Sequence, residues 1–148
     1  MDYSKVFAIS AAGMQAERTR VEVATLNLAN ANTVSAPDTA GFVPQRVTLR
    51  SAAMPQAASF ATQLEQIASV ATIVPEAVVQ PTGVAPRLLH DPGHPLANAA
   101  GMVAQPAVDT AGEMVTIMSA MRSYEANVAA ASAARTLALK TLEIGGGS

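Results

Sequence analysis

The chain has 148 residues and a formal net charge of −2, with 14% charged residues, 3% aromatic residues and no cysteine. This composition excludes disulfides and thiolate metal sites, and it lacks the basic charge by which nucleic-acid-binding proteins hold phosphates. Soluble domains usually contain about 25% charged residues, so we expect much of this alanine-rich surface to be covered by something else.

The N-terminal segment, from residue 3 to about residue 31, has no proline and a helical pattern. Large apolar residues recur there every seven positions, which is the spacing of a helix-packing seam; they are Phe7, Met14, Val21 and Leu28. Residues 5–16 loosely imitate a secretory signal, but polar residues interrupt the apolar stretch. We therefore expect no cleaved signal peptide.

Residues 36–108 differ in pattern from the segments on either side and contain all nine prolines of the chain. The β-branched stretches 43–50 and 68–80 predict short strands, and residues 60–68 are typical of one or two helical turns. The sequence "HDPGHP" at 90–95 predicts a type II turn in which Gly93 takes a positive φ. The middle of the chain is therefore expected to be a small, irregular, β-containing segment.

The C-terminal segment predicts a helix from about residue 110 to residue 143. Its positions spaced alternately by three and four form a second seam, which Arg135 interrupts. Thr110 and Glu113 have the spacing of a capping box, and the glycines from residue 145 end the pattern. The large members of this seam are Met114, Ile117, Met121, Tyr124, Val128 and Leu142.

The sequence contains no convincing catalytic or metal-binding motif. His90 and His94 flank a Pro-Gly pair that forbids the helix needed to place both imidazoles on one face, and the chain has no further histidine to complete a zinc site. No nucleophile elbow or phosphate-binding glycine loop occurs. We expect no enzymatic activity, no cofactor and no metal, and no run of about 18 apolar residues predicts a transmembrane segment.

Three stretches resemble the axial proteins of the bacterial flagellum. "ISAAGMQAERTRVEVATLNLANANT" (9–33) is similar to the N-terminal signature of flagellar rod and hook proteins, and "EMVTIMSAMRSYEANVAAASAARTLALKTLEIG" (113–145) is similar to their C-terminal motif. "LLHDPGHPLANAAGMVAQPAV" (88–108) resembles a segment characteristic of proximal rod proteins. After Thr33 the chain departs from the usual Pro-Gly-Tyr continuation, and Met102 and Ala107 stand where a tyrosine and an asparagine are usual.

The resemblance implies a structural subunit of the flagellar proximal rod, in the periplasmic part of the basal body. Such a subunit is exported without a cleaved signal peptide by the flagellar type III apparatus, assembles helically around the export channel and transmits motor torque towards the hook. Its implied partners are further copies of itself, the other proximal and distal rod proteins and the junction with the membrane ring. No nucleic-acid partner is implied. The alternative hypothesis is a non-catalytic helical-hairpin adaptor that binds a single partner helix.

The expected fold is mainly α, with long N- and C-terminal helices pairing as a coiled-coil-like hairpin around the small β-containing segment. The expected domains are 1–35, 36–108 and 109–148, the last including the glycine-rich tail. We expect the two seams to pack against each other, within one chain or between neighbours. Candidates for helix-end and inter-subunit hydrogen bonds are Asn27, Asn30 and Asn127, and the candidate docking loop is Asp91, Pro92, Gly93, His94 and Pro95.

Overall fold

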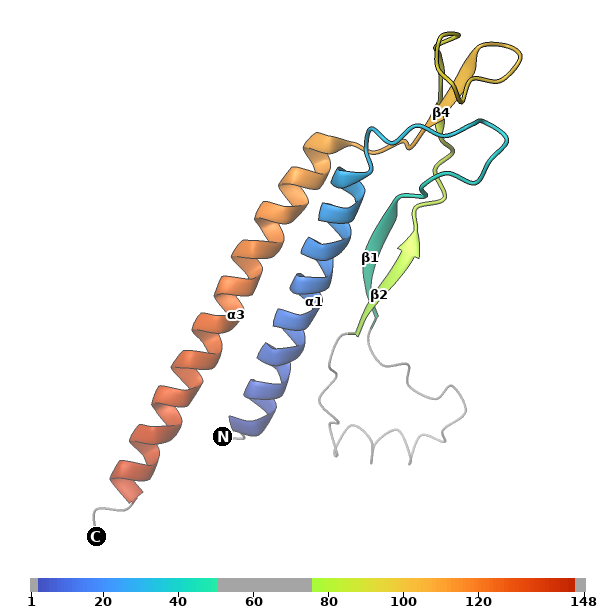
Figure 1. Cartoon of the computed structure of the whole chain (residues 1–148). Coiled ribbons are helices and arrows are strands. Elements are labelled where there is room, and N and C mark those ends of the chain that lie inside the picture. The colour runs from blue at the N-terminus through green and yellow to red at the C-terminus, as the bar shows by residue number, and fades with distance from the viewer. Residues whose placement is uncertain (1–2, 51–75, 146–148) are drawn as a thin grey trace, which may run out of the picture. The chain divides into compact units, whose positions relative to one another are not determined.

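The computed structural model describes residues 3–50 and 76–145, and these residues are mainly helical, with two small sheets (Figure 1). The order of elements is α1 (Tyr3–Ala29), β1 (Gln45–Arg50), β2 (Glu76–Pro81), β3 (Arg87–His90), β4 (Met102–Gln105) and α3 (Thr110–Gly145). The predicted fold class is confirmed at this level: two long helices near the ends and a β-containing middle.

The first helix, α1, ends at Ala29, within a cluster of asparagines at positions 27, 30 and 32. The Asn30 backbone N–H donates to Leu26 O at 3.2 Å, and the Asn30 side chain donates to the same carbonyl at 2.9 Å. Asparagine competes for local backbone groups in this way and so favours helix ends. The predicted end near residue 31 is confirmed to within two residues.

The second long helix, α3, has 36 residues and a length of about 54 Å at 1.5 Å per residue. Its first turn is closed by the Glu113 N–H, which donates to Asp109 O at 2.9 Å. The helix begins at the predicted Thr110 and ends at Gly145, close to the expected limit. Neither α1 nor α3 combines the length and the hydropathy that crossing a lipid bilayer requires.

The strands form two separate ribbons. β1 pairs with β2, and β3 pairs with β4 in an antiparallel register that sets Leu88 opposite Ala104 and His90 opposite Met102. The strand predicted at 43–50 is confirmed as β1, and β2 falls at the end of the strand predicted at 68–80. The helical turn predicted at 60–68 and the first part of that strand lie outside the described residues.

The turn after β3 differs from the prediction. Among the described glycines, positive φ occurs at Gly83 and Gly101, at 69° each, so the type II turn expected at Gly93 is wrong. The His94 N–H donates to Asp91 O at 3.2 Å, and a proline in the second position of the turn also suits a type I turn, which needs no positive φ. At Gly101 a Cβ atom would lie 3.0 Å from both the His90 ring and Pro92.

The chain divides into two compact units, each with a core made mainly of small residues. One unit contains α1 up to Arg18 and α3 from Met121, and its buried residues are Ser10, Ala16 and Ala134. The other contains Thr19–Thr48 and Val79–Ala120, and its buried residues include Ala24, Asn27, Ala31, Val103, Ala104 and Ala120. Small side chains let backbones approach closely but bury little apolar surface.

Candidate functional site

A fully buried asparagine ties together the end of α1, the start of β1 and the start of α3. Asn27 is 0% exposed; its side-chain Nδ2 donates to Gln45 O at 2.7 Å and to Glu113 Oε1 at 2.8 Å. The Gln45 N–H donates back to Asn27 Oδ1 at 2.9 Å. The amide thus bonds both backbone groups of Gln45, much as a neighbouring strand would. We call this arrangement the Asn27 hub.

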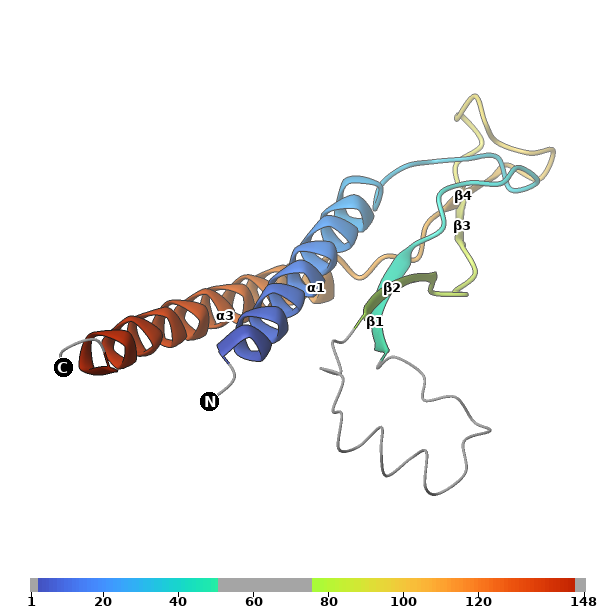
Figure 2. The same ribbon diagram turned by 90° about the horizontal axis from the view of Figure 1, so that it is seen from below.

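The Asn27 hub leaves Asn27 no spare donor, because an asparagine amide has only two hydrogens and both are used within the chain. In both ribbon views the last turns of α1 lie beside the first turns of α3, as the bond to Glu113 requires (Figures 1 and 2). Arg20, Arg46 and Glu113 line a recess of about 220 Å³ next to the hub. Glu113, predicted as part of a capping box, is the acceptor that fixes α3 to α1 here.

A second close contact joins the two helices at Gly13. A Cβ atom on Gly13 would lie 2.8 Å from Nδ2 of Asn127 and 2.9 Å from its Cγ. The same Nδ2 donates to Ser123 O at 3.0 Å, so the Asn127 side chain lies along its own helix and faces Gly13. At this point α1 approaches α3 so closely that only a residue without a side chain fits undisturbed.

The residues of the predicted seams lie mostly away from these contacts. Phe7 is 39% exposed, while Met14, Val21 and Leu28 are half-buried, as is Ile117. The other members on α3 are exposed; they are Met114, Met121, Tyr124, Val128 and Leu142. The buried residues of α3 are instead Ala120 and Ala134, each one residue before a position of the predicted seam (121 and 135). The packing of the two seams against each other, within one chain or between neighbours, stays a prediction.

Three methionines mark the exposed side of α3. Met114, Met118 and Met121 are spaced by four and three residues, which places them on one face of a helix. Their exposed fractions are 53%, 59% and 53%. We call this set the methionine stripe. Such unbranched, polarizable side chains adapt to irregular surfaces, and the chain's own residues leave them about half uncovered.

The predicted docking loop is an ordered, exposed turn. The Asp91 N–H donates to Gly101 O at 2.9 Å, and Asp91, Pro92, Gly93 and Pro95 are exposed. His94 is half-buried, and its Nδ1 accepts a hydrogen bond from the Leu96 N–H at 3.1 Å. The two histidines belong to no group of potential metal ligands among the described residues. Docking of this loop on a neighbour stays a prediction.

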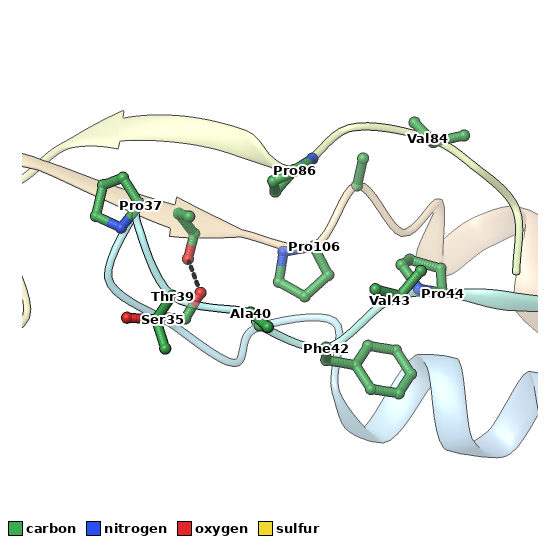
Figure 3. A pocket seen from close by; sticks show the side chains of 13 residues that line it. Ser35, Pro37, Thr39, Ala40, Phe42, Val43, Pro44, Val84, Pro86 and Pro106 are labelled. Atoms are coloured by element: carbon green, nitrogen blue, oxygen red, sulfur yellow. Dashed lines mark hydrogen bonds between the residues drawn. The ribbon is translucent and has the colours of Figure 1, made fainter.

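An apolar pocket of about 210 Å³ lies in the second unit, beside the contact between residue 35 and β4 (Figure 3). Pro37, Pro86 and Pro106 contribute to its wall together with Phe42, and Ser35 Oγ donates to Ala104 O at 3.5 Å. Its lining has no ionisable side chain. The pocket therefore fits an apolar group, and its described lining offers no acid, base or nucleophile beyond the hydroxyls of Ser35 and Thr39.

Comparison with known proteins identifies the family. Residues 99–144 match the family model described as "Flagellar basal body rod FlgEFG protein C-terminal". The chain is 36% identical over 140 residues to the flagellar basal-body rod protein FlgC of Escherichia coli O6:H1, an alignment that covers 95% of this chain and 96% of the relative. It is also 36% identical over 141 residues to FlgC of Bacillus subtilis strain 168, covering 93% and 94% of the two chains.

The chain belongs to the FlgC family of flagellar basal-body rod proteins. FlgC of Salmonella typhimurium strain LT2 is 35% identical over 140 residues, covering 95% and 96% of the two chains. The family resemblance predicted from the two terminal motifs is thereby confirmed. The matched segment 99–144 contains β4 and nearly all of α3, so the methionine stripe and Asn127 both lie within the part of the chain typical of rod proteins.

Sequence patterns did not single out Gly13 or the side-chain role of Glu113. A glycine inside a helix costs about 1 kcal/mol relative to alanine, so Gly13 in the middle of a predicted helix was a usable signal for a close approach. Glu113 gave no comparable signal, since its partner Asn27 is 86 residues away in the sequence.

Proposed function

We propose that this FlgC-family chain is a structural subunit of the flagellar proximal rod, without catalytic activity, that assembles helically around the export channel and transmits torque towards the hook. Family membership supports a role as a rod subunit, and the relatives' names place those relatives in the flagellar basal body. The periplasmic part of the basal body, reached by type III export without a cleaved signal peptide, is the proposed location. Its proposed partners are further copies, the other proximal and distal rod proteins, the membrane-ring junction and the export apparatus.

The observation that carries the assembly proposal is the uneven distribution of large and small side chains. Most of the buried residues are alanines, and Gly13 and Asn27 lie at the close contacts between the helices, whereas the methionine stripe is more than half exposed. Full burial of a methionine contributes about 1.5–3 kcal/mol. Covering the exposed half of three such side chains would therefore contribute on the order of 2–4 kcal/mol per subunit. Neighbouring subunits in a rod would supply that cover.

The two helices are proposed to act as a coiled-coil-like rod-core hairpin, with 1–35 and 109–148 as the core segments and 36–108 as the outer segment. The Asn27 hub and the Gly13 contact support this pairing at two separate points. Within the hairpin, the predicted seam residues face neighbouring chains rather than each other. Asn30 is not fully buried and uses one of its two side-chain N–H groups on Leu26 O, so the other is proposed to bond a neighbour.

Replacement of Met121 by aspartate tests the proposal in cells. A charge in a subunit interface that is otherwise apolar should abolish rod assembly and swimming, because an unpaired buried charge is strongly destabilising. Met121→Leu is the matched control, since it keeps an apolar side chain of similar volume. Motility on soft agar and the yield of rods from membrane preparations are the measurements. Full motility of the Met121→Asp strain would contradict the proposal.

The alternative is an adaptor that binds one partner helix through the same stripe. The exposed methionines favour it as well, because a single amphipathic helix could cover them. An adaptor would form a discrete complex and would be absent from purified basal bodies, whereas a rod subunit would be a stoichiometric component of them.

A further inference from the structure

Strand β3 presents unused backbone hydrogen-bonding groups along its outer edge. On β4, both backbone groups of Ala104 bond to Ser35 at 2.9 Å. Both backbone groups of Met102 bond to Asn98: the Met102 C=O accepts from the Asn98 backbone N–H at 3.0 Å, and the Met102 N–H donates to Asn98 Oδ1 at 3.0 Å. The backbone N–H and C=O groups of Ala104 and Met102 therefore point away from β3. In an antiparallel ladder the backbone N–H and C=O groups of their partners, Leu88 and His90, must then point away from β4.

The outer edge of β3 is consequently an open row of donors and acceptors. Leu88 and His90 each direct an N–H and a C=O outward, and within the described residues none of these groups has a partner. The other edge of the ribbon is covered, because Ser35 and Asn98 occupy it. An exposed edge of this kind is a ready template for another strand.

Side chains on the edge are apolar in the centre and charged at both ends. Leu88 is 59% exposed and Leu89 is 54% exposed. Arg87, which precedes them, and Asp91, which follows His90, are also exposed. Arg87, Leu89 and Asp91 lie on one face of the strand because side chains alternate between faces.

We propose that the edge of β3 pairs with the edge of β3 in a second copy of this chain, in antiparallel orientation about a two-fold axis at Leu89. In this register Leu88 of one copy bonds His90 of the other, and the reciprocal pair forms on the other side of the axis. The result is one four-stranded sheet in the order β4-β3-β3-β4. Every outward backbone group of Leu88 and His90 then has a partner.

The same register makes the side chains complementary, which is the reason for choosing a second copy as the occupant. Leu89 lies opposite Leu89 of the second copy and buries an apolar surface that is now exposed. Arg87 lies opposite Asp91 of the second copy, and Asp91 lies opposite its Arg87, so an ion pair closes each end. Directly opposed side chains have Cβ atoms about 4.5–5.5 Å apart, within reach of such pairing.

This pairing goes beyond the proposed role in the rod. A two-fold contact uses the same patch on both copies and closes on itself, whereas a helical assembly needs contacts between different patches. The β3 pair therefore cannot propagate along a rod. It is a form of the free subunit that must separate, or stay unformed, when the subunit enters the assembly.

Disulfide trapping in this cysteine-free chain tests the register directly. In the proposed dimer the two Leu89 Cα atoms form a non-hydrogen-bonded pair about 4.5 Å apart, within the range that a disulfide spans. The two Leu88 Cα atoms are offset by two residues along each strand and lie more than about 7 Å apart, beyond that range. Leu88→Cys is thus a matched control, since both positions are similarly exposed.

Under mild oxidation of the purified full-length chain, Leu89→Cys should form a covalent dimer at least about tenfold faster than Leu88→Cys. Adding Asp91→Arg to Leu89→Cys should slow the reaction at low salt, because it opposes two pairs of like charges. Adding Arg87→Asp as well should restore the rate. Equal rates for the two cysteine variants, or rates indifferent to both charge changes, would overturn the proposal. Because the readout is a covalent dimer of the free chain, it is independent of motility and rod assembly.

Discussion

The effect of Gly13→Ala on stability is expected to depend on the side chain at position 127. It should be destabilising when asparagine is there and stabilising when alanine is there. Alanine inside a helix is favoured over glycine by about 1 kcal/mol. The new Cβ would lie 2.8–2.9 Å from the Asn127 amide, so that side chain must rotate and give up its bond to Ser123. Losing that bond and crowding the contact together cost about 2–3 kcal/mol. Gly13→Ala alone should therefore destabilise the chain by about 1–2 kcal/mol.

In an Asn127→Ala background the clash disappears, and Gly13→Ala should then stabilise the chain by about 1 kcal/mol. The double-mutant cycle should give a coupling energy of about 2–3 kcal/mol, within the range of residues in contact. Urea denaturation of the four purified proteins, followed by circular dichroism at the helix band, measures all of these values. If Gly13→Ala is equally stabilising in both backgrounds, the two helices do not meet at this point and the pairing is refuted.

Two further substitutions test the polar hub and the β3–β4 turn. Asn27→Ala should destabilise the chain by about 2–3 kcal/mol, since it removes a hydrogen bond to a carboxylate and leaves buried partners unsatisfied. Asn30→Ala should cost under about 1 kcal/mol. Similar urea midpoints for the two variants would count against the hub. Gly101→Ala should be more destabilising than Gly83→Ala by about 1 kcal/mol, because both have a φ of 69° but only at Gly101 would a Cβ meet neighbours, at 3.0 Å. Equal losses in thermal denaturation would show that backbone strain alone acts at Gly101.

The helices, β1 and the position of β2 were predictable because their signals are local. Absence of proline, seven-residue spacing and asparagines at the end set the limits of α1, and the glycine tract set the end of α3. The β3–β4 ribbon was not predicted. Each of its strands has four residues, and the bonds from Ser35 and Asn98 that complete it come from outside the ribbon.

The burial pattern of α3 shows why the facing side of a helix is harder to predict than the helix. A seven-residue spacing fits positions 113, 120, 127 and 134 as well as positions 114, 121 and 128. Hydrophobicity favoured the second set, yet Ala120 and Ala134 are the buried residues. Close approach at Gly13 selects small side chains, and no local signal in α3 reveals where its partner has a glycine. The role of Asn27 is hidden for the same reason, since Gln45 and Glu113 are distant in sequence.

The central claim is that neighbouring subunits cover the methionine stripe in the assembled rod. Thiol labelling of Met118→Cys tests it most directly, because this substitution places a single thiol in a chain that has none. Position 118 is 59% exposed, so the free chain should react rapidly with a maleimide. In purified basal bodies the reaction should be at least about tenfold slower, since interface cores exclude solvent, and dissociation of the rods should restore the free rate. A labelling rate in intact basal bodies equal to that of the free chain would contradict the account, because the stripe would then remain uncovered in the assembly.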